Sequence, residues 1–211
     1  MAGAIQDVGN QVERIWNDLR PVTRHLVERA WQSGDSAAVS QSERVAVGGA
    51  ATPYDARSDW ELGRLLTALD ERVRELERTN SAEPVRKARD IAETCVRLLT
   101  ERTQSAEIFA QLIVRAQERQ DYRRIEMLAN TLASRLAPSE ICEMARSSNA
   151  VVRGIAQDVL THEPAPILAA LLRDPIDGDV ARLALERQMT DYGTDEAQHL
   201  LTDTDRARSN S

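Results

Sequence analysis

Residues that could carry chemistry are scattered along this chain, outside the spacings that known reactions need. Its histidines, His25, His162 and His199, form no His-Glu-x-x-His pair, and Cys95 and Cys142 form no Cys-x-x-Cys pair. Those spacings place zinc ligands around one ion, so the sequence predicts no metal site. The chain also has no Gly-x-Ser-x-Gly elbow and no glycine-rich phosphate loop. We therefore expect no cofactor, and the sequence leans against an enzyme, although a fold can still assemble a catalytic site from distant residues.

Three arginines recur at an equal spacing of 27 residues: Arg119, Arg146 and Arg173. A structural repeat of that length would stack them along one edge. In one interpretation, each arginine is a cation near the C-terminus of a helix, where the helix dipole favours it by about 0.3–1 kcal/mol. In the other, the row grips a carboxylate-bearing or phosphorylated partner.

Three tryptophans, Trp16, Trp31 and Trp60, all precede the repeated part of the chain. As core anchors they would join the N-terminal helices and need no further role. If exposed, they would anchor a partner, because Trp is enriched among the residues that dominate interface energies. The tryptophans and the three arginines are therefore the candidate partner-binding residues.

Apolar side chains between Val114 and Met189 recur about every 27 residues, in a pattern of helix pairs. In the second helix of each pair, the aligned triplets are Ile125, Val152 and Val180; Leu128, Ile155 and Leu183; and Ala129, Ala156 and Ala184. Their i, i+3, i+4 spacing places them on one helical face. With one extra residue allowed between the last two copies, Asn149 and Asp177 align as N-caps. In the first copy Tyr122 takes that place, and Asp121 comes one residue before it.

The most regular copy reads Pro-Ala-Pro-Ile-Leu-Ala-Ala-Leu-Leu-Arg-Asp-Pro at 164–175, followed by Asp-Gly-Asp-Val-Ala-Arg at 177–182. Residues 105–201 thereby resemble HEAT and armadillo-like repeats, with a period shorter than the ~40 residues typical of them. The resemblance implies helix pairs stacked into a short right-handed α-solenoid whose concave face binds a protein or peptide. Such scaffolds also host enzymes and ligand-binding proteins, which is the alternative function.

Three apolar seams with steps of three and four residues precede the repeat and predict helices. The seams are Ile5, Val8, Val12, Ile15, Leu19, Val22 and Leu26; Leu62, Leu66, Leu69, Val73 and Leu76; and Val85, Ala88, Ala92, Cys95 and Leu99. Pro21 either begins a new helix or kinks one, and Ser58-Asp59-Trp60-Glu61 has the form of a capping box. The short connection after Arg78 predicts an antiparallel hairpin. Alternatively, the seams could join two copies of the chain as a homodimer.

The bulk composition is that of an all-α protein with 42% hydrophobic and 29% charged residues. The net charge is −7, which argues against duplex nucleic acid as the partner. No stretch approaches the ~20 apolar residues of a membrane span. The first residues carry no secretory pattern, so we expect a cytoplasmic protein whose cysteines are reduced core residues.

These patterns predict an N-terminal antiparallel helical bundle over residues 1–104, with a mobile loop at 34–57. The helical-repeat region follows over 105–202, and 203–211 is expected to be a disordered tail. The function that we expect is that of a protein-protein interaction or scaffold module with a protein or peptide partner.

Overall fold

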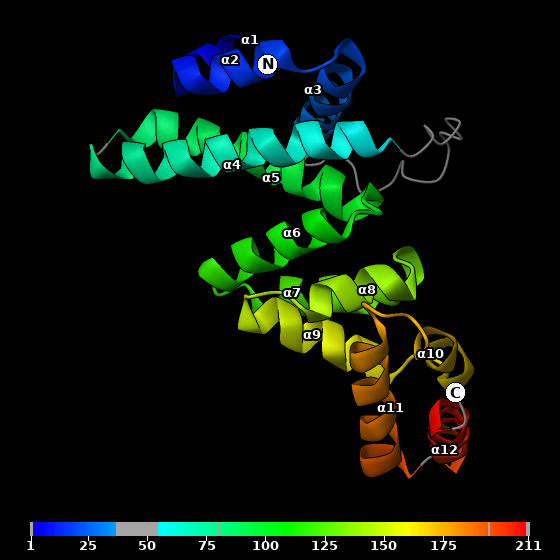
Figure 1. Ribbon diagram of the computed structural model, residues 1–211. Helices are drawn as coiled ribbons and strands as arrows, with labels where there is room; N and C mark the ends of the chain where they lie inside the picture. Colours follow the sequence, from blue (N-terminus) through cyan, green and yellow to red (C-terminus); the bar gives the residue numbers. More distant parts are fainter. Residues whose placement is uncertain (1, 37–54, 80, 194, 210–211) are drawn as a thin grey trace. The chain divides into compact units, whose positions relative to one another are not determined.

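The computed structural model describes residues 2–36, 55–79, 81–193 and 195–209, and within them it contains twelve α-helices and no strand (Figure 1). The predicted all-α class is therefore confirmed. Residues 37–54 of the predicted loop lie outside the described residues, while its two ends, 34–36 and 56–57, belong to helices. The chain divides into two compact units, residues 1–103 and 104–211, which we call the N-terminal and C-terminal units.

The described part of the N-terminal unit contains α1 (Ala2–Val8), α2 (Asn10–Asp18), α3 (Pro21–Ser36), α4 (Ala56–Arg78) and α5 (Ala82–Arg102). The two longest helices, α4 and α5, pack along each other. Because only a short connection joins them, they run antiparallel. Helix α1 packs on α5, α2 packs on α4, and α3 contacts both.

The core of the N-terminal unit is built from the predicted seams. Every residue of the second and third seams is buried: Leu62, Leu66, Leu69, Val73, Leu76, Val85, Ala88, Ala92, Cys95 and Leu99. In the first seam the register changes at Pro21, which is the first residue of α3. Val22 is therefore 45% exposed, and Thr23 and Val27 take the inward positions. The alternative in which Pro21 begins a new helix is confirmed.

A second break in the first seam, at Gly9, was not predicted. Gly9 separates α1 from α2 and has φ 135°, a conformation that L side chains rarely adopt. The Arg72 side chain passes over it, and Arg72 Nε donates to the Val8 carbonyl at 2.7 Å. A Cβ atom at Gly9 would lie 3.0 Å from that nitrogen. The backbone angle therefore requires glycine, and an added Cβ atom would also displace the Arg72 guanidinium.

The predicted capping box at Ser58 and Glu61 is wrong. Helix α4 begins earlier, at Ala56, and its N-cap is Asp55, whose side chain accepts from the Arg57 N–H at 3.1 Å. Ser58 and Glu61 lie inside the helix and are buried. Their side chains contact α3 and the residue before it, as described below.

The described part of the C-terminal unit contains α6 (Ala106–Glu118), α7 (Tyr122–Arg135), α8 (Pro138–Ala145), α9 (Ala150–Thr161), α10 (Ala165–Leu171), α11 (Gly178–Tyr192) and α12 (Asp195–Ser209). Consecutive helices pack as pairs, α6 with α7, α8 with α9, and α10 with α11. The first helices also contact one another in the order α6, α8, α10, and the second helices in the order α7, α9, α11. Each pair thus covers an apolar face of the next.

The repeat in the second helices has a period of 28 residues, not 27. Their N-caps are Asp121, Asn149 and Asp177, which are equally spaced. The positions that match in this register are buried: Leu128, Ala156 and Ala184, followed by Leu132, Leu160 and Gln188. The alignment predicted from sequence was one residue off after the first copy, so it matched buried Leu128 with Leu183, which is 39% exposed.

Two of these three N-caps act through their side chains. Asp121 accepts from an N–H of the first turn of α7, and Asn149 accepts from two in α9. Asp177 makes no side-chain cap, contrary to the prediction. Instead, the turn before α11 is held by Asp174, whose Oδ1 accepts from the Ile176 and Asp177 N–H groups at 2.8 and 2.9 Å.

The last helix extends beyond the predicted boundary. Helix α12 continues to Ser209, so residues 203–209 are helical rather than a frayed tail. Asp195 and Glu196 in its first turn suit the helix dipole, and no Gly or Pro follows to end the helix. Residues 210–211 lie outside the described residues.

Candidate functional site

The three tryptophans occupy different environments in the N-terminal unit. Trp16 is buried and only 5% exposed, and Trp31 is half-buried. Trp60 is 51% exposed on α4, where the Arg64 guanidinium lies 4.8 Å from its ring centroid. Trp16 is therefore a core anchor, and of the three only Trp60 is an exposed residue.

The three arginines all lie just past the end of a first helix in the C-terminal unit. Arg119 is the C-cap of α6, Arg146 is the C-cap of α8, and Arg173 directly follows the C-cap of α10. Arg146 is engaged within the fold, because its Nη1 donates to Asp177 Oδ1 at 2.6 Å and to the Ile176 carbonyl at 3.3 Å. This contact gives Arg146 a role within the fold, between the end of α8 and the turn before α11.

A partly buried polar cluster of five residues, which the sequence analysis missed, joins α4 to the start of α3. Arg20 donates to Asp55 Oδ2 at 2.6 Å, to Glu61 Oε1 at 2.9 Å and to Ser58 Oγ at 3.1 Å. Thr23 donates from Oγ1 to Glu61 Oε2 in a short hydrogen bond and lies 3.0 Å from Ser58 Oγ. The members lie 35–41 positions apart, so no local pattern reveals them.

The polar cluster is internally satisfied. Asp55 accepts hydrogen bonds from Arg20 and Ser58, and these lower its pKa below the usual value, with Arg20 having the larger effect. The same contact with Asp55 raises the pKa of Arg20. Each charged group of the cluster is paired with an opposite charge. The cluster therefore fixes α3 against α4, and none of its charged groups lacks a counter-charge.

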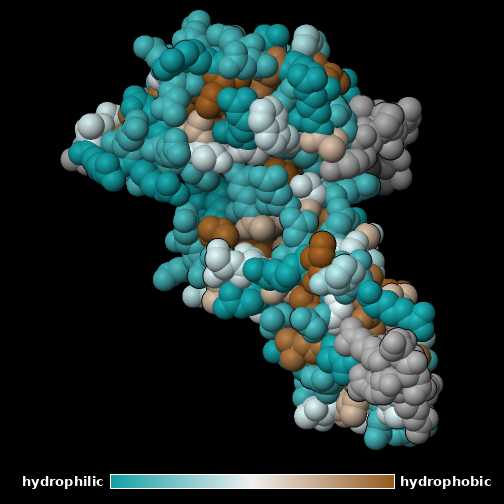
Figure 2. Space-filling model, viewed as in Figure 1, coloured by the Kyte–Doolittle hydropathy of each residue, from teal (hydrophilic) through white to brown (hydrophobic). Residues whose placement is uncertain are grey.

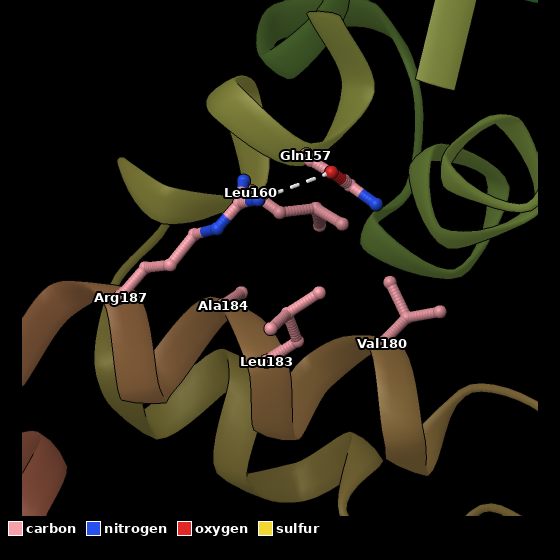
Figure 3. A pocket seen from close by; sticks show the side chains of 6 residues that line it. All are labelled: Gln157, Leu160, Val180, Leu183, Ala184 and Arg187. Atoms are coloured by element: carbon pink, nitrogen blue, oxygen red, sulfur yellow. Dashed lines mark hydrogen bonds between the residues drawn. The ribbon is translucent and has the colours of Figure 1, made fainter. Parts of the chain in front are cut away.

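A narrow groove lies between α9 and α11 in the C-terminal unit. Figure 3 shows Val180, Leu183 and Ala184 extending from α11 toward Leu160 on α9. At one end, Arg187 Nη2 donates to Gln157 Oε1 at 3.3 Å. The groove is too narrow to hold a water molecule between its walls. It is therefore a line of packing between the two helices, with mostly apolar side chains along it.

An apolar row runs across the second helices at one repeat position. Met127, Ile155 and Leu183 each lie six residues after the N-cap of their helix. Met127 is 45% exposed, Leu183 is 39% exposed, and Ile155 is half-buried. We call these three residues the apolar row. In Figure 2, apolar side chains reach a mostly hydrophilic surface as separate patches over α7, α8 and α9.

A more open hollow of about 300 Å³ lies where α9 and α11 end. It is lined by Thr161, His162, Glu163, Pro164, Ala165, Gln188, Tyr192 and Glu196. These residues come from the end of α9, the start of α10, the last turns of α11 and the first turn of α12. The volume is at the lower end of the range for small-ligand sites.

Hydrogen bonds set the state of the polar groups in this hollow. His162 Nδ1 lies 2.9 Å from the Asp158 carbonyl, which can only accept, so Nδ1 carries the proton. In the neutral ring, Nε2 then accepts from the Tyr192 hydroxyl at 3.1 Å. Tyr192 and His162 also meet edge to face, with ring centroids 5.7 Å apart. This pair holds the C-terminal ends of α9 and α11 together.

The described ranges contain no group of three or more His, Cys, Asp or Glu residues arranged to hold a metal ion. None of their helices combines the length and the apolar character needed to cross a membrane. Both cysteines are free and buried, as predicted.

Comparison with protein-family models, with curated proteins and with solved structures found no match to this chain.

Proposed function

We propose that this chain is a protein-interaction module whose C-terminal unit is a short right-handed α-solenoid and whose N-terminal unit is an antiparallel helical bundle. The equal spacing of Asp121, Asn149 and Asp177 supports the solenoid, as does the contact of each helix with its counterpart in the next pair. Stacked pairs of this kind form an extended surface on which partners bind.

The observation that carries the proposal is the apolar row. A single exposed apolar side chain on a protein surface needs no explanation. Three at the same repeat position, on helices that pack against one another in turn, repeat the same apolar feature across the stack, and clustered apolar surface marks partner sites. Met127, Ile155 and Leu183 therefore define the face of the solenoid that we assign to the partner.

The energy available from the row is moderate. Fully burying a Leu or Met side chain contributes about 1.5–3 kcal/mol. Since Met127 is 45% exposed and Leu183 is 39% exposed, covering each contributes about 1 kcal/mol. The two together are worth about 30-fold in affinity. The row thus suits a peptide or protein that makes additional polar contacts around it.

The partner that we propose is a protein or peptide with apolar side chains, bound by one copy of the chain. The second and third helical seams, which could have joined two copies, are buried within the N-terminal unit itself, and most of the first seam is buried before Pro21, which favours a monomer. Two free cysteines favour a reducing compartment such as the cytoplasm. Light scattering is expected to report the mass of a single chain.

A peptide library displayed on phage and selected against the full-length chain tests the proposal. Selected peptides are labelled, and their affinity is measured by fluorescence anisotropy. We expect the double variant Met127→Ser/Leu183→Ser to bind them about 30-fold more weakly than the wild type, because the apolar contact is lost.

The matched control is Val22→Ser, which removes a side chain of similar exposure, 45%, from α3 in the other unit. It is expected to leave the affinity unchanged. Equal binding of the peptides to the double variant and the wild type would refute the assignment of the face, and so would a selection that yields no binder.

A further inference from the structure

The hollow at the ends of α9 and α11 has a surplus of hydrogen-bond acceptors. None of its eight lining residues is Lys or Arg, and two are glutamates, Glu163 and Glu196. The one hydroxyl at its aromatic wall, that of Tyr192, already donates to His162. A ligand in this hollow therefore meets negative charge and acceptor atoms.

Gln188 supplies an acceptor that has no partner. Its side chain is more than nine-tenths buried, and its Nε2 donates to the Thr161 carbonyl at 3.0 Å and to the Glu163 carbonyl at 2.6 Å. Both carbonyls can only accept, so the amide cannot be turned around. Gln188 Oε1 accepts from no residue in the described part of the chain. Although the residue is buried, this oxygen atom is not sealed from solvent, so it can accept a hydrogen bond from a donor that enters the hollow.

Glu163 supplies a negative charge that is only partly hydrated. Glu163 lines the hollow, and its carboxylate forms no ion pair with any residue that the structure describes. Burial raises the pKa of Glu163, and no neighbouring cation opposes that shift. A cation that enters the hollow restores the electrostatic stabilisation that burial removes.

One further feature favours positive charge at the same place. The Tyr192 ring is 56% exposed at the wall and can accept a cation on its face.

From these groups we propose that the hollow binds an ammonium or guanidinium group, with Glu163, Glu196 and Gln188 Oε1 as the acceptors. An ammonium offers three donors and a guanidinium offers five, with no acceptor in either. An anion would instead face two carboxylates. The inference goes beyond the proposed function and does not depend on the apolar row. The cation comes either from a Lys or Arg side chain of a partner or from a free polyamine.

Isothermal titration calorimetry of the full-length chain tests this site with three probes. N-acetyl-arginine amide carries the charged group, N-acetyl-citrulline amide is its neutral analogue of the same shape, and spermidine represents the free polyamines. We expect saturable binding of the arginine probe below about 10 mM and none of the citrulline probe. Tighter binding of spermidine than of the arginine probe would point to a free polyamine, and the reverse order to a partner side chain.

Two variants connect binding to the hollow. Glu163→Gln keeps the size of the side chain and removes its charge, and Glu196→Gln does the same at an exposed position where folding is not at risk. Each is expected to weaken binding, Glu163→Gln by about tenfold or more. Glu186→Gln is the matched control, since Glu186 is exposed on α11 and does not line the hollow.

Three results would overturn the proposal. They are equal binding of the citrulline probe, wild-type affinity in both Glu163→Gln and Glu196→Gln, and the absence of saturation by the arginine probe and spermidine at about 10 mM. The same loss of affinity in Glu186→Gln would also count against it, because it would show attraction to the overall acidic surface.

Discussion

The polar cluster at the start of α4 makes a sharp prediction for Thr23→Val. Thr23 is fully buried, and its hydroxyl is the donor to Glu61 Oε2. The other contacts of the Glu61 carboxylate, with Arg20 and Arg57, use Oε1. Valine has nearly the same volume as threonine, so the substitution removes the donor from Oε2 without opening a cavity.

The magnitude follows from this geometry. A hydrogen bond to a charged group contributes about 1.5–3 kcal/mol, and burying the new methyl group of valine returns about 0.8 kcal/mol. The free energy of unfolding of the N-terminal unit should therefore fall by about 1–2 kcal/mol. A change of that size is well outside the ±0.5 kcal/mol typical of exposed substitutions.

Urea unfolding followed by tryptophan fluorescence measures this change in one unit. Trp16, Trp31 and Trp60 are the three tryptophans of the chain, and all lie within residues 1–103. Fluorescence therefore reports on the N-terminal unit even if the two units unfold separately.

The control is Thr67→Val, which makes the same change at an exposed site of α4. The Thr67 hydroxyl donates to the Gly63 carbonyl of its own helix at 3.1 Å. Its effect should stay within about 0.5 kcal/mol. If Thr23→Val and Thr67→Val destabilise the unit equally, the cluster does not hold α3 against α4 as argued.

Three other predictions follow from single residues. Gly9→Ala should destabilise the N-terminal unit by about 1–3 kcal/mol in the same fluorescence assay, because alanine is strained at φ 135°; wild-type stability would contradict this reason. Burial raises the pKa of the Cys142 thiol to about 11, so iodoacetamide should not label it at pH 7 before the chain unfolds, which mass spectrometry of native and denatured samples can check. The Asp177 N–H, and to a lesser extent the Ile176 N–H, donates to the Asp174 carboxylate and lowers its pKa below 3.8. The stability that this carboxylate contributes is therefore present above pH 3.8 and is lost as the pH falls through the lowered pKa. Asp174→Asn should therefore lose less stability than the wild type between pH 4 and 2, as followed by helical circular dichroism; parallel pH profiles would count against this contribution.

The helices and most of the core could be predicted from sequence because their signals are local. A stripe such as Leu62, Leu66 and Leu69 is visible in a window of eight residues, and all three are buried. The local Ser-x-x-Glu pattern wrongly predicted that Ser58 and Glu61 form a capping box. Their actual partners, Arg20 and Thr23, are 35–41 positions away, so the spacing that resembles a cap carried no information about them.

The repeat register failed for a different reason. Apolar residues tolerate a shift of one position on a helix, because neighbouring positions also lie near the buried face. The N-caps do not tolerate it, since a cap must begin the helix. Had Asp121, Asn149 and Asp177 been aligned first, the 28-residue period and the apolar row would have followed.

The hollow could have been suspected from the correct period. Contacts between successive pairs join residues about one repeat apart: Tyr192 and His162 are separated by 30 positions, and Gln188 and Thr161 by 27. Gln188 takes the repeat position that Leu132 and Leu160 occupy in the earlier copies. This polar residue in place of leucine is the sign that the last helix pair packs differently at that position. The free Oε1 of Gln188 could not be predicted, because it depends on which carbonyls its Nε2 reaches.

Hydrogen–deuterium exchange of the full-length chain, with and without a selected peptide, tests the apolar row most directly. A partner on Met127, Ile155 and Leu183 should slow amide exchange in α7, α9 and α11 together, because it suppresses local opening of the three helices that it bridges. Exchange in α1–α5 should stay unchanged. Protection confined to α1–α5, or to the first helices α6, α8 and α10, would contradict the assignment of the row as the partner site.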